Sequence, residues 1–266
     1  MEHSIITIAT NKQSYYKFAI ACARSVLLSN NIPFYIVTNL DVKVPRDLRG
    51  KVILLEAEKD QAKLGIGIKL FIDKYVQTEK TLFIDSDCIC YSSLQPIFEA
   101  FKGKSVSVVG NVVDARLFCG SKQAKTIKDN FNIDKLVKFN GGVYYIERSE
   151  KSTKIFDDAR QIIPKYDSFG FNRINNKWIN EEGLISISMI MNGETPIPDD
   201  GRYMTDLFTD PKSSRLNPLT GERILNNPNK NKLKHRPWYP IGDYSPIIIH
   251  FGGSSLTSYP YISQYY

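Results

Sequence analysis

A short apolar stretch that ends in two aspartates constrains the fold of this chain more than any other feature. Residues 81–84 (Thr-Leu-Phe-Ile) are β-prone and largely apolar, a pattern typical of a buried strand in a parallel sheet. Asp85 and Asp87 follow at once, with Ser86 between them. Two carboxylates this close repel each other, and a divalent cation with oxygen ligands is the natural compensation. An acidic turn that caps a following helix is the alternative.

The composition permits one large domain with a full core, because 42% of the 266 residues are hydrophobic. No segment approaches the roughly 20 apolar residues that a membrane span needs. Residues 4–9 are expected to form a first strand and not part of a signal peptide. The cysteines lack metal-site spacing, so we expect reduced thiols in a cytoplasmic protein. They are Cys22, Cys88, Cys90 and Cys119.

The net charge of +7 favours an anionic partner, which is a nucleotide phosphate, nucleic acid or an acidic membrane surface. We do not expect nucleic acid, because the chain shows no recognisable nucleic-acid-binding module. The tyrosine-rich residues 259–266, together with the positive charge, permit weak peripheral contact with the inner face of an anionic membrane. An ordinary packed or frayed tail is the alternative for this segment.

The first half of the chain alternates predicted strands and helices. Strands are expected at residues 4–9, 34–38, 51–55, 81–84 and 105–109, and helices at about 13–29, 60–76 and 94–101. This order predicts an α/β fold with a mixed, mainly parallel sheet that is flanked by helices on both faces. Ligands of such sheets bind beyond the carboxyl ends of the strands, which is where Asp85 and Asp87 are expected.

The second half is less regular. Helices are expected at about 121–130, 149–163 and 180–191, with a strand at 143–146 that follows Asn140-Gly141-Gly142. A late apolar strand at 246–249 leads into His250. The rest of this region is rich in Pro, Asn and Gly, so we expect an irregular C-terminal extension of one domain.

Four segments, in this order along the chain, resemble motifs of GT-A-fold glycosyltransferases. The resemblance is closest to glycosyltransferase family 8, which includes glycogenin-like and bacterial lipopolysaccharide enzymes. The segments are Ile-Ala-Thr-Asn at 8–11, Leu-Phe-Ile-Asp-Ser-Asp at 82–87, Phe-Asn-Gly-Gly-Val at 139–143 and Ile-His-Phe-Gly-Gly at 249–253. The resemblance implies a single Rossmann-like GT-A domain over residues 1–266. It places a nucleotide-binding half at 1–110, and an acceptor-binding half with a C-terminal loop region at 111–266.

The resemblance implies a metal-dependent hexosyltransferase with a UDP-hexose donor and a glycan or glycolipid acceptor. It assigns Mn²⁺ or Mg²⁺ to Asp85, Asp87 and His250, a donor set that suits Mn²⁺ and places the cation on the departing diphosphate. An ordinary strand-end histidine is the alternative for His250. Gly252 and Gly253 favour the metal site, because backbone without side chains can approach phosphate closely.

Donor-binding residues are also implied by the resemblance. Thr10 and Asn11 leave the first strand where the family binds the base and ribose, although they are also suited to cap the following helix. Ser86 is expected to contact the ribose through its backbone. Lys69 is expected to face the diphosphate or the sugar, with an exposed surface lysine as the alternative.

The segment Asn140-Gly141-Gly142 resembles the family's Asn-Ala/Gly-Gly, whose amide and backbone groups meet the sugar hydroxyls. Close backbone packing is the other explanation of the glycine pair. Glu181 and Glu182 are the candidate catalytic residues, because this position faces the reacting sugar in the fold. Stabilising the amino end of their own helix is the simpler role.

Two departures from family 8 are apparent. Retaining members usually carry Asp-Gln where this chain has Glu181-Glu182, whereas inverting members keep an acidic base, so the stereochemistry stays open. One glutamate is expected to deprotonate the acceptor hydroxyl or to contact the transferring sugar. Family 8 also follows its late histidine with Lys-Pro-Trp, which residues 253–257 lack. A basic cluster is expected to supply the missing charge. It comprises Lys232, Lys234, His235 and Arg236.

Two other functions compete with glycosyl transfer. A sugar nucleotidyltransferase has a similar sheet, but it usually carries a glycine-rich basic loop after the first strand, which residues 10–13 do not resemble. A non-catalytic protein that binds glycan or nucleic acid through a basic face is the second. Such a protein predicts no metal-dependent nucleotide binding, which separates it from both enzymes.

Overall fold

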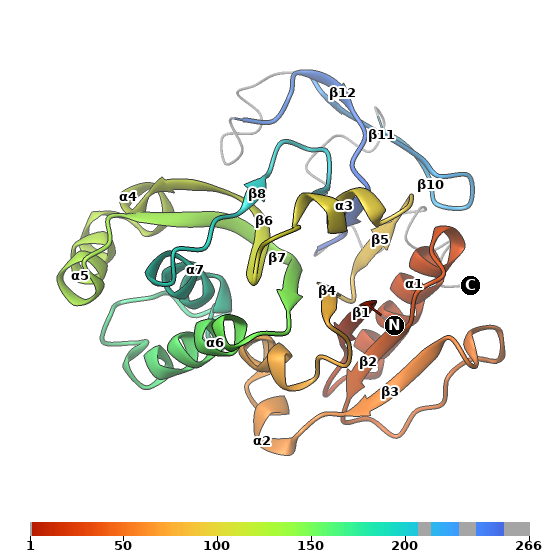
Figure 1. The fold of residues 1–266 in the computed structure, drawn as a ribbon, viewed down its shortest axis with the longest axis horizontal. Helices are drawn as coiled ribbons and strands as arrows, with labels where there is room; N and C mark the ends of the chain where they lie inside the picture. Colours follow the sequence, from red (N-terminus) through yellow and green to blue (C-terminus); the bar gives the residue numbers. More distant parts are fainter. Residues whose placement is uncertain (1, 207–213, 229–237, 253–266) are drawn as a thin grey trace.

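The computed structural model describes residues 2–206, 214–228 and 238–252, and Figure 1 shows their arrangement. Its centre is a seven-stranded sheet in the order β3-β2-β1-β4-β7-β6-β8. These strands are β1 (His3–Ile8), β2 (Phe34–Thr38), β3 (Val52–Glu56), β4 (Lys80–Ile84), β6 (Val106–Asp114), β7 (Lys135–Glu147) and β8 (Ile197–Pro198). All of them run parallel except β7, which is antiparallel to β4 and β6. The predicted mixed, mainly parallel α/β sheet is therefore confirmed.

Side chains that alternate along the strands form one apolar core on each face of the sheet. In β4, Leu82 and Ile84 belong to one core and Phe83 to the other. Helices α1 (Gln13–Ser29) and α3 (Gln95–Ala100) cover the first core. Helices α6 (Glu150–Ile162) and α7 (Glu181–Met191), with the 3-10 helix η2 (Gly65–Lys74), cover the second. Because both faces of β4 are buried, its sequence is apolar without alternation.

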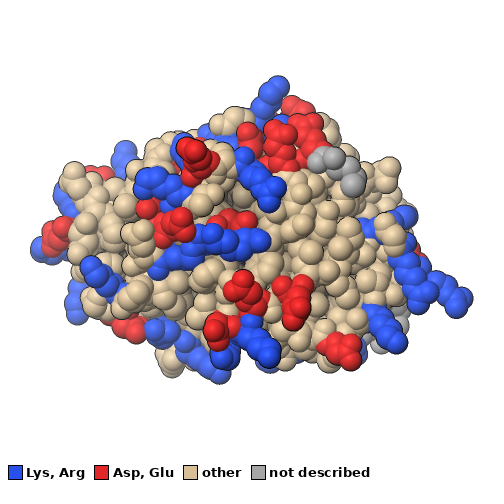
Figure 2. Space-filling view, turned by 60° about the horizontal axis from the view of Figure 1, so that its bottom comes forward, with Lys and Arg blue, Asp and Glu red and all other residues tan. Residues whose placement is uncertain are grey.

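Further helices lie around this framework. They are α2 (Lys59–Ala62), α4 (Ala115–Cys119), α5 (Ser121–Phe131), and the short 3-10 helices η1 (Arg46–Leu48) and η3 (Ile163–Lys165). Within the described residues, no helix has the length and apolar character that crossing a membrane would require. On the face drawn in Figure 2, acidic side chains border the basic ones, so this face shows no continuous basic track.

Two small sheets complete the described structure. One has the order β5-β13-β9 and consists of β5 (Cys88–Cys90), β13 (Ile248–His250) and β9 (Met204–Asp206). The other has the order β10-β11-β12 and consists of β10 (Arg215–Asn217), β11 (Glu222–Asn227) and β12 (Gly242–Tyr244). The late strand predicted at 246–249 is thus observed at 248–250, in a register fixed by pairing with β5 and β9. This pairing brings the end of the described chain beside the segment that follows Asp87.

The single helix predicted at 60–76 is wrong. The chain forms the short α2 and then the tighter 3-10 helix η2. Gly65, the first residue of η2, has φ +60°, and a Cβ there would lie 2.6 Å from the indole ring of Trp178. The left-handed turn and the packed indole therefore end one helix and start the next.

The strand predicted at 143–146 is part of the much longer β7, so Asn140-Gly141-Gly142 lie inside a strand and not before one. Pairing with β4 on one side and β6 on the other extends β7 in this way. The register with β6 shifts between Val108 and Gly110. A Cβ at Gly110 would lie 2.8 Å from the carbonyl oxygen of Lys138, so glycine permits this close approach.

Candidate active site and metal centre

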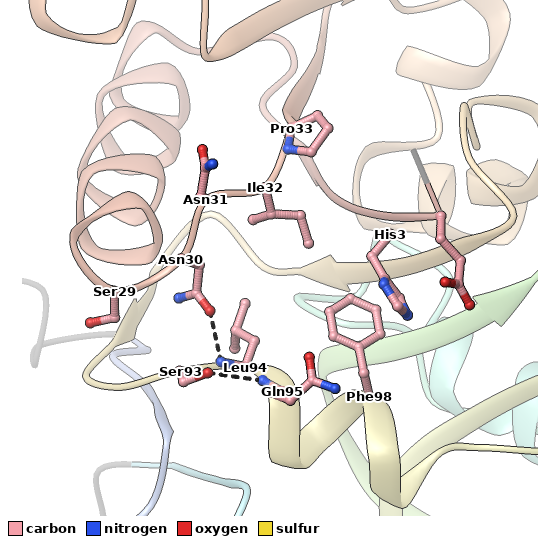
Figure 3. Close-up of a pocket in the computed structure, with 11 residues that line it drawn as sticks. His3, Ser29, Asn30, Asn31, Ile32, Pro33, Ser93, Leu94, Gln95 and Phe98 are labelled. Carbon is pink, nitrogen blue, oxygen red and sulfur yellow. Dashed lines mark hydrogen bonds between the residues drawn. The ribbon is translucent and has the colours of Figure 1, made fainter.

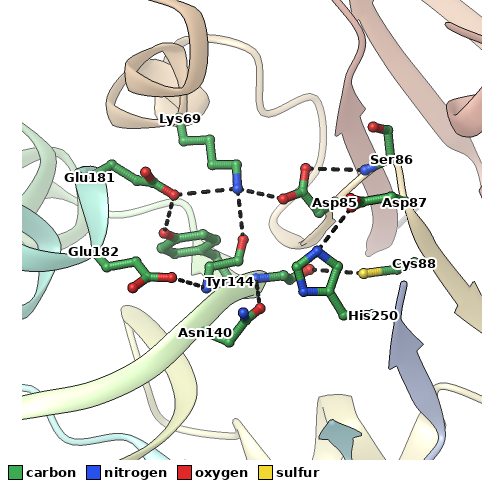
Figure 4. Close-up of polar contacts among 12 residues, drawn as sticks. Lys69, Asp85, Ser86, Asp87, Cys88, Asn140, Tyr144, Glu181, Glu182 and His250 are labelled. Carbon is green, nitrogen blue, oxygen red and sulfur yellow. Dashed lines mark hydrogen bonds and ion pairs between the residues drawn. The ribbon is translucent and has the colours of Figure 1, made fainter. Parts of the chain in front are cut away.

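Charged and polar groups from several segments meet beyond the carboxyl end of β4, and Figure 4 shows most of them. The turn after β4 supplies Asp85 and Asp87, η2 supplies Lys69, and the ends of β9 and β13 supply Asp206 and His250. The middle of β7 and the start of α7 supply the others, which are Asn140, Gly141, Gly142, Glu181 and Glu182. Residues predicted from distant motifs thus lie in one place. No sequence signal pointed to Asp206.

His250 lies directly beside the Asp-Ser-Asp segment. Its Nε2 is 3.0 Å from Oδ1 of Asp87, and the backbone N–H of Phe251 donates to the carbonyl of Asp87 at 2.9 Å. Burial favours the neutral form of Asp87, but the neighbouring imidazole outweighs it and lowers the pKa of this carboxyl. The segment after Asp87 is the strand β5, so the helix-capping explanation of these aspartates does not apply.

Lys69 is buried, with 6% of its side chain exposed, which excludes the surface-lysine alternative. Its Nζ lies 2.6 Å from Oδ2 of Asp85 and 3.3 Å from Oε1 of Glu181, and it donates to the carbonyl of Gly141 at 3.0 Å. Burial disfavours the charged ammonium, but Asp85 and Glu181 outweigh it and raise the pKa of Lys69. Lys69 is therefore a fixed positive charge that ties η2 to β4, β7 and α7.

The two glutamates differ in their surroundings. Oε1 of Glu181 accepts the hydroxyl of Tyr144 at 3.2 Å, while its buried Oε2 has no hydrogen-bond partner among the described residues. Burial raises the pKa of Glu181 despite the nearby Lys69. Glu182 accepts the backbone N–H of Gly141 at 2.8 Å. Burial and the charge of Glu181 raise the pKa of Glu182 to about 7.

The raised pKa of Glu182 predicts a pH-dependent stability. The folded chain holds this proton more tightly than the unfolded chain, whose glutamate has an ordinary pKa of 4.5. The free energy of unfolding is therefore expected to fall as the pH rises from 4.5 to 7, by at most about 3 kcal/mol from this group. Chemical denaturation of the metal-free protein at pH 5 and 7.5 measures the change. Glu182→Gln should flatten this pH dependence of stability. Glu99→Gln, at an exposed position, is the matched control and should leave the pH dependence unchanged. An unchanged pH dependence in Glu182→Gln contradicts the raised pKa of Glu182.

The glycine pair in β7 lies close to side-chain oxygens of the site. A Cβ at Gly141 would lie 2.7 Å from Oε1 of Glu181, and one at Gly142 would lie 2.9 Å from Oδ1 of Asn140. The carbonyl of Gly142 accepts the N–H of Asp85 at 2.9 Å, while its own N–H donates to Asn140 at 2.9 Å. The close-packing explanation therefore holds for both glycines, and contact with a sugar remains a prediction.

The predicted nucleotide-contacting residues lie at the carboxyl ends of β1 and β4. Thr10 is buried, and the side-chain N–H of Asn11 donates to the carbonyl of Ala62 at 2.8 Å. Neither side chain caps α1, whose N-cap Lys12 lacks a side-chain hydrogen bond, so the capping alternative is wrong. Ser86 is buried in the turn that joins Asp85 to Asp87.

Other predicted residues are less informative. At Gly252, a Cβ would meet no atom of the described residues within 4 Å. Several predictions lie outside the described residues. They concern Gly253, the basic cluster Lys232, Lys234, His235 and Arg236, and residues 254–266.

The donor set fits a hard divalent cation. Among the residues that the structure describes, five carboxylates of the site face two cationic side chains, Lys69 and His250, so this part of the site has an excess of negative charge. Ligand atoms of Asp87, Cys88 and His250 lie within 4.8 Å of one another. Burial raises the pKa of the Cys88 thiol well above its usual range, which disfavours a thiolate ligand. Asp85 lies outside this group of three, and its Oδ2 is 2.6 Å from Nζ of Lys69, so its place as a third ligand beside Asp87 and His250 stays a prediction. Carboxylate oxygens and imidazole are ligands that suit Mn²⁺.

A cavity of about 380 Å³ lies at the other end of β1, near its amino terminus (Figure 3). Its walls include His3, Asn30 and Phe98, and no residue predicted to bind donor, metal or acceptor. A second cavity of about 260 Å³ is lined in part by Phe171, Asn180 and Gly183 beside the start of α7. The second cavity thus lies beside the start of α7, although neither Glu181 nor Glu182 lines it.

No protein-family model matches this chain, and no curated protein sequence matches it significantly. Solved structures do match. An active-site mutant of LgtC aligns over 98% of this chain and 93% of its own, with 13% identity and a TM-score of 0.60. Galactosyltransferase LgtC in complex with donor and acceptor sugar analogues aligns over 94% and 87%, with 14% identity and a TM-score of 0.57. Mouse xyloside xylosyltransferase 1 aligns over 98% and 100%, with 10% identity and a TM-score of 0.57.

These neighbours are glycosyltransferases of the GT-A type, and the alignments span nearly the full length of this chain. At identities of 10–14% the likeness concerns the fold and not the substrate. The fold predicted from the four motifs is thus confirmed, while placement in family 8 stays a prediction. This chain has the GT-A fold of glycosyltransferases.

Proposed function

We propose that this chain is a metal-dependent glycosyltransferase that moves a hexose from a nucleotide sugar, a UDP-hexose, to a glycan or glycolipid acceptor. The observation that carries the proposal is the 3.0 Å approach of His250 to Asp87 beyond the sheet of a GT-A fold. Asp85, Asp87 and His250 would hold Mn²⁺ or Mg²⁺. When bound, the cation supplies charge neutralisation for the departing diphosphate.

The remaining residues of the site have roles that follow from their contacts. Lys69 fixes Asp85 and Glu181 in place and limits the repulsion between the carboxylates. Oε1 of Glu182 accepts a hydrogen bond from Gly141, and a pKa of about 7 suits a proton acceptor near neutral pH. In an inverting reaction it would take the proton of the acceptor hydroxyl. In a retaining reaction its carboxylate would instead stabilise positive charge on the transferring sugar.

The division of the chain follows the same proposal. Residues 1–110 would bind the nucleotide, through Thr10, Asn11 and the backbone of Ser86. Residues 111–266 would bind the sugar and the acceptor, with Asn140, Gly141, Gly142, Gly252 and Gly253 nearest the donor. All four cysteines are free thiols, which supports a cytoplasmic location for an enzyme that uses nucleotide sugars.

Calorimetric titration with UDP tests the proposal. Binding is expected in Mn²⁺ and should weaken at least about 10-fold when EDTA removes the metal, because the cation would neutralise the charge of the diphosphate beside the carboxylates. A panel of nucleotide sugars, screened for Mn²⁺-dependent hydrolysis, then identifies the donor. The proposal is contradicted if UDP binds with the same affinity with and without the metal, or if UDP does not bind at all. Release of pyrophosphate from UTP and a sugar phosphate would favour the nucleotidyltransferase instead.

A further inference from the structure

The side chain of His250 is held at both ring nitrogens. Nε2 lies 3.0 Å from Asp87, and Nδ1 lies 2.8 Å from Oδ1 of Asp206. The three side chains are largely buried, with exposed fractions of 15% for His250, 23% for Asp87 and 16% for Asp206. Each ring nitrogen therefore has its own carboxylate.

The small sheet explains this arrangement. β13 is its central strand, antiparallel to β5 and parallel to β9. His250 pairs in register with Cys88 on β5 and with Asp206 on β9. Paired residues on neighbouring strands share a face of a sheet, so Asp206 reaches His250 from the side opposite Asp87. The register of β13 with β9 therefore fixes the contact between His250 and Asp206, because both residues lie in paired strands.

We infer that Asp206 is the positioning residue for His250: its carboxylate accepts the Nδ1 proton and orients Nε2 toward Asp87 and the cation. This inference rests on the proposed function. The nitrogens of one imidazole point in different directions, so a cation bound at Nε2 leaves Nδ1–H to a hydrogen-bond acceptor. A carboxylate in that place fixes the tautomer, restricts ring rotation and makes Nε2 a stronger ligand. Asp206 thus acts on the metal through His250 and is not a ligand itself.

A double-mutant cycle on Mn²⁺ binding tests the inference, with affinity measured by calorimetry in the presence of UDP. Asp206→Ala is expected to weaken Mn²⁺ binding about 10–100-fold. Asp206→Asn keeps an acceptor oxygen and should recover part of the loss. In a His250→Ala background, Asp206→Ala should cause no further loss, because the residue it positions is gone. Equal losses in both backgrounds overturn the inference, whether they arise from direct ligation or from damage to the fold.

Pulsed EPR of the bound Mn²⁺ gives a readout that does not depend on turnover. The wild-type protein should show a coupling to ¹⁴N that His250→Ala removes. Asp206→Ala should reduce that coupling, and Asp206→Asn should restore it. An unchanged coupling in Asp206→Ala overturns the inference alone. If the wild-type protein binds no Mn²⁺ with UDP, the proposed function fails first and the inference with it, so the two failures are distinguishable.

Discussion

Replacing Asp87 by asparagine is expected to lower the rate of sugar transfer at least about 100-fold, since even partners of metal ligands typically contribute 10–100-fold. The substitution keeps the shape of the side chain but removes a negative charge from the proposed cation site. It also removes the carboxylate that lies 3.0 Å from Nε2 of His250. Mn²⁺-dependent UDP binding, followed by calorimetry, should weaken together with the rate.

A surface carboxylate provides the matched control for this substitution. Asp129 on α5 pairs with Lys125 at 2.6 Å, and 55% of its side chain is exposed. Asp129→Asn removes the same charge from the chain and should leave transfer and UDP binding unchanged. If Asp87→Asn behaves like this control, the metal site does not include Asp87.

The sequence predicts β4 and its acidic end well because their signal is local. An apolar run followed by Asp85 and Asp87 can be recognised without knowledge of any other segment, and the run is buried on both faces as expected. The order of strands and helices likewise predicts the parallel part of the sheet. His250 is different, since only the resemblance to a family connects it with Asp87. The structure brings the two together by pairing β13 with β5.

Other parts of the site have no local signal. Asp206 ends a three-residue strand in a region without clear periodicity, and its contact with His250 depends on a pairing between distant segments. The local sequence does not predict the ionic environment of Lys69 either. A lysine in an amphipathic stretch is usually exposed, and only the packing of η2 against β4 and α7 buries its ammonium among carboxylates. Tertiary packing, and not local propensity, therefore determines both the contact of Asp206 with His250 and the burial of Lys69.

The burial of Lys69 predicts the largest effect on stability. Lys69→Met preserves much of the side-chain volume but leaves Asp85 and Glu181 without their shared cation. Breaking a buried ion pair in this way typically costs about 3–5 kcal/mol. Glu181 already has a raised pKa and can take up a proton instead, so the loss should be smaller at pH 5 than at pH 8. Denaturant unfolding of the metal-free protein at both pH values measures this loss of stability.

Two further variants distinguish the lost charge from the lost contacts of the side chain. Lys69→Met combined with Glu181→Gln removes one of the carboxylates that the ammonium neutralises, so it should recover part of the stability at pH 8. Lys74→Met, at the end of the same helix, replaces a lysine that is 49% exposed, and should cost less than about 1 kcal/mol. A double variant no more stable than Lys69→Met alone would show that packing around the lysine stem, and not neutralisation of Glu181, accounts for the burial of Lys69.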